Sequence, residues 1–174
     1  MKRLFSLFAL TLMAAISFSA SAQSSIVGKW DAEAGNQLAL LEQLNGQLEK
    51  QTSIMTFDSD AHYSCSSHIK ATADLGGIIM YMDMSTIERG TWRTEGDTIA
   101  MTITDMDLIQ CDITFSDTSL NSMNEVIAQN IQEQYDSVVG TQVTYNMEVI
   151  NNDKIVLEFD NETMSMGFTL TRIR

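Results

Sequence analysis

The chain of 174 residues has no proline and only two histidines. Its turns must therefore be made by Gly, Asn and Asp, as in Asp58-Ser59-Asp60 and Asn151-Asn152-Asp153. The two histidines lack a neighbouring nucleophile signature such as Gly-x-Ser-x-Gly, which argues against a hydrolase. Neither a zinc-ligand spacing nor a phosphate-binding loop is present. We expect a protein that is not an enzyme and holds no cofactor.

Positive charge is also scarce. Ten Lys and Arg stand against 23 Asp and Glu, which gives a formal net charge of −13. Nucleic-acid phosphates and anionic membrane surfaces would be repelled by such a protein. The composition therefore predicts a soluble protein with no nucleic-acid partner, and leaves any protein partner unidentified.

The chain has no long apolar run beyond its first 22 residues, so no membrane span is expected. Lys2 and Arg3 precede an apolar stretch over 4–18, and Ala20-Ser21-Ala22 fits a cleavage site. This pattern predicts a signal peptide over 1–22 and a secreted or periplasmic protein beginning near Gln23. Losing Lys2 and Arg3 would take the formal charge from −13 to −15. Residues 23–174 suit one domain.

Only two cysteines are present, Cys65 and Cys111. Because an exported protein meets an oxidising compartment, we expect them to form a disulfide. The long loop between them would make this bond worth about 3–4 kcal/mol. Two buried free thiols are the alternative.

Short alternating segments dominate the rest of the chain and predict about ten antiparallel strands in a sandwich or barrel. The expected strands are 26–30, 54–57, 63–73, 78–85, 88–94, 98–104, 109–115, 142–150, 155–159 and 164–173.

Two segments have helical spacing instead. Asn36–Gln51 carries leucines at 38, 41, 44 and 48, and Thr118–Val138 carries Leu120, Met123, Ile127, Ile131 and Val138, with Asp117 placed as its cap. Both should be amphipathic helices that cover the sheet or an open barrel end. Because Asn36–Gln51 follows the first strand, it is the better candidate for a gate, with Leu41 and Leu44 facing the opening.

The first strand contains Gly28-Lys29-Trp30, and Arg172 lies in the last strand with Arg174 beside it. Gly90-Thr91-Trp92, followed by Glu95-Gly96-Asp97, adds a second pattern in the middle of the chain. Together they resemble the lipocalin superfamily, most closely its short bacterial secreted branch. The resemblance implies an all-β, up-and-down antiparallel barrel of about eight to ten strands, with one or two amphipathic helices. It also implies barrel closure by Gly28, Trp30 and Arg172, in which Arg172 stacks on Trp30.

Methionine is abundant, and strand parity places most of it on the apolar faces. Met80-Tyr81-Met82-Asp83-Met84 presents three methionines to one side of a single strand. The same inward faces define the candidate ligand-binding residues: Met55, Phe57, Tyr63, Met80, Met82, Met84, Trp92, Met101, Met147, Met164, Met166 and Phe168.

Three interpretations of these residues remain open. In the first, which we prefer, they line a pocket for a small apolar molecule. In the second, they fill the barrel, and the protein is an interaction module that binds a partner protein through its acidic surface. The third is a periplasmic copper(I) site of Met80, Met82 and Met84. Their spacing of about 6.5–7 Å along one strand disfavours copper, and we expect no metal.

Overall fold

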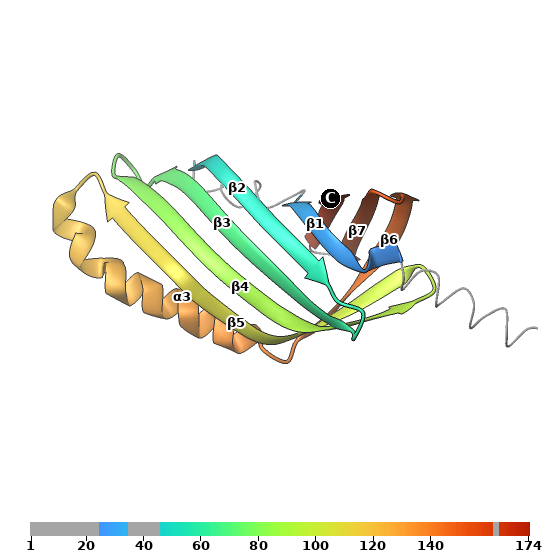
Figure 1. The fold of residues 1–174 in the computed structure, drawn as a ribbon. Coiled ribbons are helices and arrows are strands. Elements are labelled where there is room, and N and C mark those ends of the chain that lie inside the picture. Colours follow the sequence, from blue (N-terminus) through green and yellow to red (C-terminus); the bar gives the residue numbers. More distant parts are fainter. Residues whose placement is uncertain (1–24, 35–45, 162–163) are drawn as a thin grey trace, which may run out of the picture.

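The computed structural model describes residues 25–34, 46–161 and 164–174, with the backbone alone at 34, 160–161 and 164–166. Over these residues it is a β-structure with one helical segment (Figure 1). The strands are β1 (Gly28–Ala34), β2 (Gly46–Phe57), β3 (His62–Asp74), β4 (Ile79–Glu95), β5 (Thr98–Phe115), β6 (Gln142–Asn151), β7 (Lys154–Asn161) and β8 (Met164–Arg172). A 3-10 helix η1 (Thr118–Met123) and an α-helix α3 (Asn124–Val138) connect β5 to β6.

The strands form a closed antiparallel barrel in chain order. Each strand pairs with the next, and β8 returns to pair with β1 through Trp30 and Arg172. The predicted all-β barrel is therefore confirmed, with eight strands among the described residues. In the same part of the chain, no helix combines the length and apolar character that a bilayer crossing would need.

Fewer strands are present than the ten expected, because two pairs of predicted strands are continuous. Segments 78–85 and 88–94 both belong to β4, and segments 98–104 and 109–115 both belong to β5. The β5 pairing with β4 skips one residue twice, at Thr104 and at Ile109. Each of these β-bulges reverses the alternation of faces in β5, so this one bent strand has the sequence pattern of two.

The predicted helix at Thr118–Val138 is confirmed, although its first six residues are 3-10. Asp117 caps it, since its carboxylate accepts from the Ser119 amide at 3.0 Å. Met123, assigned to the apolar stripe, is 48% exposed instead. No residue of α3 is fully buried. The helix thus lies over β5 as a partial cover (Figure 1).

Side-chain amides from this helical segment bind the edge of β5. Only Thr98–Thr102 of β5 pairs with β6, which leaves later backbone groups without a strand partner. Gln132 accepts from the Leu108 amide at 3.2 Å and donates to the Met106 carbonyl at 3.4 Å. Asn121 accepts from the Phe115 amide at 3.0 Å. These amides take the place of a neighbouring strand and satisfy backbone groups that would otherwise be costly to shield from water.

We expect Gln132→Ala to lower the free energy of unfolding by about 1–2 kcal/mol, because it leaves the Leu108 amide without its acceptor. Amide hydrogen exchange at Leu108 should accelerate in the same variant. Gln129→Ala is the control, since Gln129 bonds only to Glu133 on the exposed face of α3. Equal protection of Leu108 in both variants would contradict this role.

The prediction of a helix over Asn36–Gln51 is wrong from residue 46 onward, and residues 36–45 lie outside the described part of the chain, as do Leu41 and Leu44 of the suggested gate. Gly46–Gln51 forms the start of β2, where Leu48 pairs with Ala71. The length of β3 explains this outcome: its Lys70–Ala73 end needs a hydrogen-bonding neighbour, and tertiary pairing overrides the helical leucine spacing.

Trp30 and Arg172 pack against each other where β1 pairs with β8. The guanidinium carbon of Arg172 lies 4.1 Å from the centroid of the fully buried Trp30 ring. Arg172 also donates to three carbonyls, those of Ser25, Val27 and Asn152, at 2.6, 3.0 and 2.8 Å. A Cβ on Gly28 would overlap the Arg172 guanidinium, which explains the glycine. The cation–π contact implied by the sequence resemblance is therefore present.

Candidate functional site

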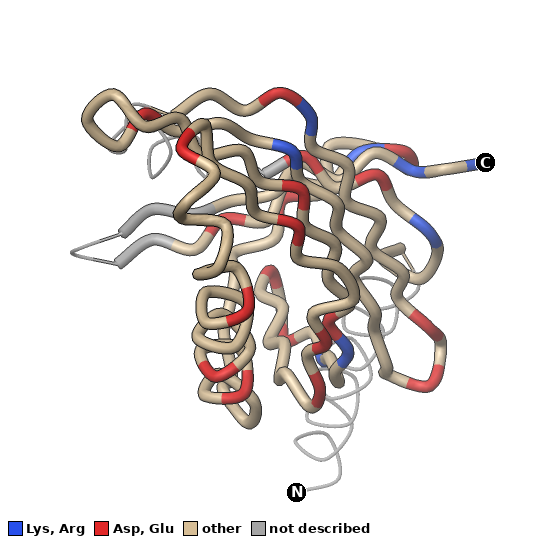
Figure 2. Tube along the Cα trace, turned by 90° about the vertical axis from the view of Figure 1, so that its left-hand side faces the viewer, with Lys and Arg blue, Asp and Glu red and all other residues tan. Residues whose placement is uncertain are grey.

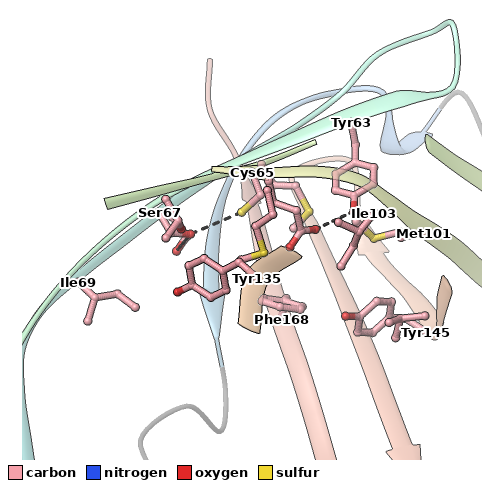
Figure 3. A pocket seen from close by; sticks show the side chains of 15 residues that line it. Tyr63, Cys65, Ser67, Ile69, Met101, Ile103, Tyr135, Tyr145 and Phe168 are labelled. Carbon is pink, nitrogen blue, oxygen red and sulfur yellow. Dashed lines mark hydrogen bonds between the residues drawn. The ribbon is translucent and has the colours of Figure 1, made fainter. Parts of the chain in front are cut away.

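A cavity of about 300 Å³ lies inside the barrel (Figure 3). Side chains from six strands and from α3 line it: Ser53, Met55, Tyr63, Cys65, Ser67, Ile69, Thr86, Glu88, Met101, Ile103, Met106, Tyr135, Val143, Tyr145 and Phe168. Figure 3 shows Tyr63, Cys65 and Ser67 on one side of this space, with Tyr135, Tyr145 and Phe168 across from them. The barrel is hollow at this level, and its wall is both aromatic and polar.

Glu88 and Tyr63 form a partly buried polar contact in the wall of the cavity. Tyr63 lies opposite Gly90 across the β3–β4 pair, and its ring covers the glycine. This position carries the Tyr63 hydroxyl two residues along β4, where it donates to Oε1 of Glu88 at 2.7 Å. Gly90 thus makes room for the ring that holds the carboxylate.

Small polar side chains of β2 and β3 lie next to Glu88 in the same wall of the cavity. The hydroxyls of Ser53 and Ser67 lie 2.9 Å apart, and the Cys65 thiol lies 3.6 Å from Ser67 Oγ. Ser53 is only 4% exposed, so its hydroxyl depends on this internal partner. The cavity therefore offers hydrogen-bonding groups on the β2–β3 side.

Burial controls ionisation in this cavity. Burial raises the pKa of Glu88 above its ordinary value, and the hydrogen bond from Tyr63 opposes part of that rise. Burial also raises the pKa of Cys65 to about 11 and that of Tyr145 to about 12. The pKa of Tyr63 rises as well, through burial and the nearby Glu88 charge. Glu88 is the one carboxyl group among the described residues that line the cavity.

We expect Glu88→Gln to stabilise the protein at pH 7.5 and to leave its stability unchanged at pH 4. A folded pKa above the unfolded value of 4.5 means that the protonated carboxyl stabilises the fold at low pH. This contribution is lost as the pH rises through the raised folded pKa. Each tenfold difference in proton affinity corresponds to about 1.4 kcal/mol. The groups facing Glu88, namely Tyr63, Cys65, Tyr135 and Tyr145, remain neutral over this range because burial raises the pKa of each.

Urea unfolding at the two pH values measures this effect. Glu95→Gln is the control. Glu95 lies on the same strand but is exposed, so its replacement removes one negative charge that is not buried. A Glu88→Gln variant less stable than the wild type at pH 7.5 would contradict the assignment.

Of the twelve predicted ligand-binding residues, four line the cavity: Met55, Tyr63, Met101 and Phe168. Phe57, Trp92 and Met147 belong to the closed core of the barrel instead. There Trp92 meets Phe57 edge-on, with ring centroids 5.6 Å apart, and donates to the His62 carbonyl at 2.9 Å. The side chains of Met164 and Met166 lie outside the described residues.

The three methionines of Met80–Met84 do not line the cavity. They pair with Ala73, Ala71 and Ile69 on β3 and with Phe115, Ile113 and Cys111 on β5. They therefore share the inner face with apolar neighbours, at the end of β4 that extends past the β5–β6 pairing. Nowhere in the described part of the chain do three His, Cys, Asp or Glu side chains converge as a metal site would require.

The predicted disulfide is wrong for this structure, in which Cys65 and Cys111 are free thiols. Cys65 pairs with Glu88, and Cys111 pairs with Met84 on the other side of β4. The cysteines are thus two strand spacings apart laterally, roughly 9–10 Å, and four residues apart along β4, roughly 13 Å. A disulfide requires Cα atoms within about 7 Å.

Several lining residues were not among the predicted site residues, above all the polar ones and Tyr135 of α3. The alternation of faces along β4 could have identified some of these residues. Extending the even-numbered face of Met80, Met82 and Met84 toward Trp92 leads through Thr86, Glu88 and Gly90. Tyr135 had no comparable signal, because helical spacing alone does not say which part of a sheet a helix covers.

No family model matches the chain, and no curated protein matches it. Among solved structures, the chain is similar to an uncharacterized protein from Bacteroides eggerthii DSM 20697, with 12% identity, 85% of this chain and 99% of the other covered, and a TM-score of 0.32. The closed eight-stranded antiparallel barrel is compatible with a lipocalin-like fold.

Proposed function

We propose that this protein binds a small molecule in its barrel cavity, as a lipocalin-like binding protein. The observation that carries the proposal is the space of about 300 Å³ lined by residues of six strands and α3. This volume is at the small end of ligand pockets, which range over about 300–1,000 Å³. A cavity of this kind favours a binding role over a filled barrel. The aromatic and thioether groups suit an apolar body, and the Glu88 wall suits a polar group attached to it.

We also propose that the protein is exported, with cleavage after Ala22, as the leader pattern predicts. The mass and N-terminal sequence of the protein from its own cells test this. A binding role agrees with the apolar and aromatic groups that the described residues bring to the lining.

Native mass spectrometry of protein purified without denaturant from its own cells tests the binding role. We expect an added organic mass that leaves on unfolding. Ser67→Phe, which fills the cavity, should abolish the added mass, whereas Ser66→Phe should retain it, because Ser66 lies on the opposite face of β3. A bare mass in the wild type, or equal retention by the two variants, would contradict the proposal.

A further inference from the structure

We propose that the ligand is a small organic cation, whose ammonium group lies against the Glu88 carboxylate and among the rings of Tyr63, Tyr145 and Phe168. This inference rests on the proposed function and specifies its ligand class. It follows from three properties of the cavity, namely its uncompensated carboxylate, its aromatic wall and its size.

The carboxylate of Glu88 has no cationic partner inside the barrel. Among the described residues that line the cavity, none is Lys, Arg or His. Three basic residues of β3 and β4 bind carboxylates outside the cavity lining: Lys70 and His68 bind Asp83, and Arg89 binds Asp105 and Asp107. The Tyr63 hydroxyl bonds to Oε1 of Glu88, and no residue that the structure describes is seen to donate to Oε2. Glu88 is partly buried. A carboxylate that has lost part of its water and has no counter-ion is disfavoured in its charged form, so a ligand that supplies the positive charge offsets this cost.

The surrounding rings favour a cation over a neutral donor. Tyr145 and Phe168 lie edge-on, with centroids 5.9 Å apart, and the Glu88 charge acts on both Tyr63 and Tyr145. Aromatic faces attract ammonium groups, and this attraction is strongest where water is excluded. The hydroxyls of Ser53, Ser67 and Thr86 add acceptors for N–H groups on the same wall.

The outer surface supports the same ligand charge. Asp and Glu are spread over the strands and along α3, which has no Lys or Arg (Figure 2). A negative surface raises the local concentration of small cations and lowers that of anions. The volume of about 300 Å³ restricts the ligand to one small ring or a short chain besides its amine.

Calorimetric titration of the wild-type protein with three probes of matched size tests this inference at pH 7.5: 2-phenylethylamine, 2-phenylethanol and phenylacetate. We expect the amine to bind at least about tenfold more tightly than the alcohol, and phenylacetate to show no binding. Glu88→Gln keeps the acceptor for Tyr63 but removes the charge, so the amine should lose its advantage while the alcohol binds as before. Glu95→Gln is the control and should preserve the advantage of the amine.

The outcomes separate the two proposals. Equal affinity for amine and alcohol in the wild type, or an amine preference that survives in Glu88→Gln, would overturn the cation inference while leaving a binding cavity. If none of the three probes binds and the protein from its own cells has a bare mass, both proposals fail. Lowering the pH through the raised pKa of Glu88 should weaken amine binding and leave alcohol binding unchanged, since the amine stays protonated.

Discussion

Gly90→Ala should lower the free energy of unfolding by about 3 kcal/mol or more, the upper end for overpacking a core. A Cβ at this position would overlap the carbonyl oxygen of Thr102 and come within 2.5 Å of the Tyr63 ring. The Thr102 oxygen belongs to a backbone held between β4 and β6, so neither neighbour can yield without disturbing strand pairing.

The variant also tests the site, because the Tyr63 ring must move and its hydroxyl then loses Glu88. Urea unfolding measures the stability change. Gly96→Asn is the matched control: Gly96 has φ +62° and open space around it, and Asn tolerates that conformation. A Gly90→Ala variant within about 0.5 kcal/mol of the wild type would show that the strands adjust and that Gly90 does not position Tyr63.

Trp30→Ala should cost about 3–5 kcal/mol, as expected for truncating a fully buried large aromatic side chain. The loss has two parts. The core loses a ring that packs among the buried residues and donates to the Ile26 carbonyl at 2.7 Å. Arg172 also loses the ring face on which its guanidinium lies, while its three bonds to backbone carbonyls remain.

Comparison of Trp30→Phe with Trp30→Ala in urea unfolding separates these parts, because Phe keeps an aromatic face but not the indole N–H. Tyr81→Ala is the control, since Tyr81 is 48% exposed and should cost little. A loss for Trp30→Ala no greater than that for Tyr81→Ala would contradict the closure role.

The sequence predicted the barrel well where a strand alternates without interruption. The parity of Tyr63, Cys65, Ser67 and Ile69 was correct, because β3 pairs with β4 without a bulge. The helix over Thr118–Val138 was correct because its cap and its stripe agree. Both predictions rest on local periodicity, which can be recognised in a single sequence.

Prediction failed at the cavity for a related reason. The inner face of β4 changes there from Met84 to Thr86, Glu88 and Gly90, and this polar stretch has the sequence pattern of a gap between two strands. The residues that give the cavity its chemistry are thus the ones that interrupt the apolar alternation. A binding site inside a core departs from the pattern that specifies the core.

The pairing of β1 with β8 has a consequence for how the protein reaches this structure. Every other strand pairs with its neighbour in the chain, but Trp30 must find Arg172 across nearly the whole domain. Until β8 has formed, the remaining strands are an open meander with two unpaired edges, and such edges invite association with other chains. We therefore expect the contacts of Arg172 to form late in folding, and variants that weaken them should aggregate more during refolding.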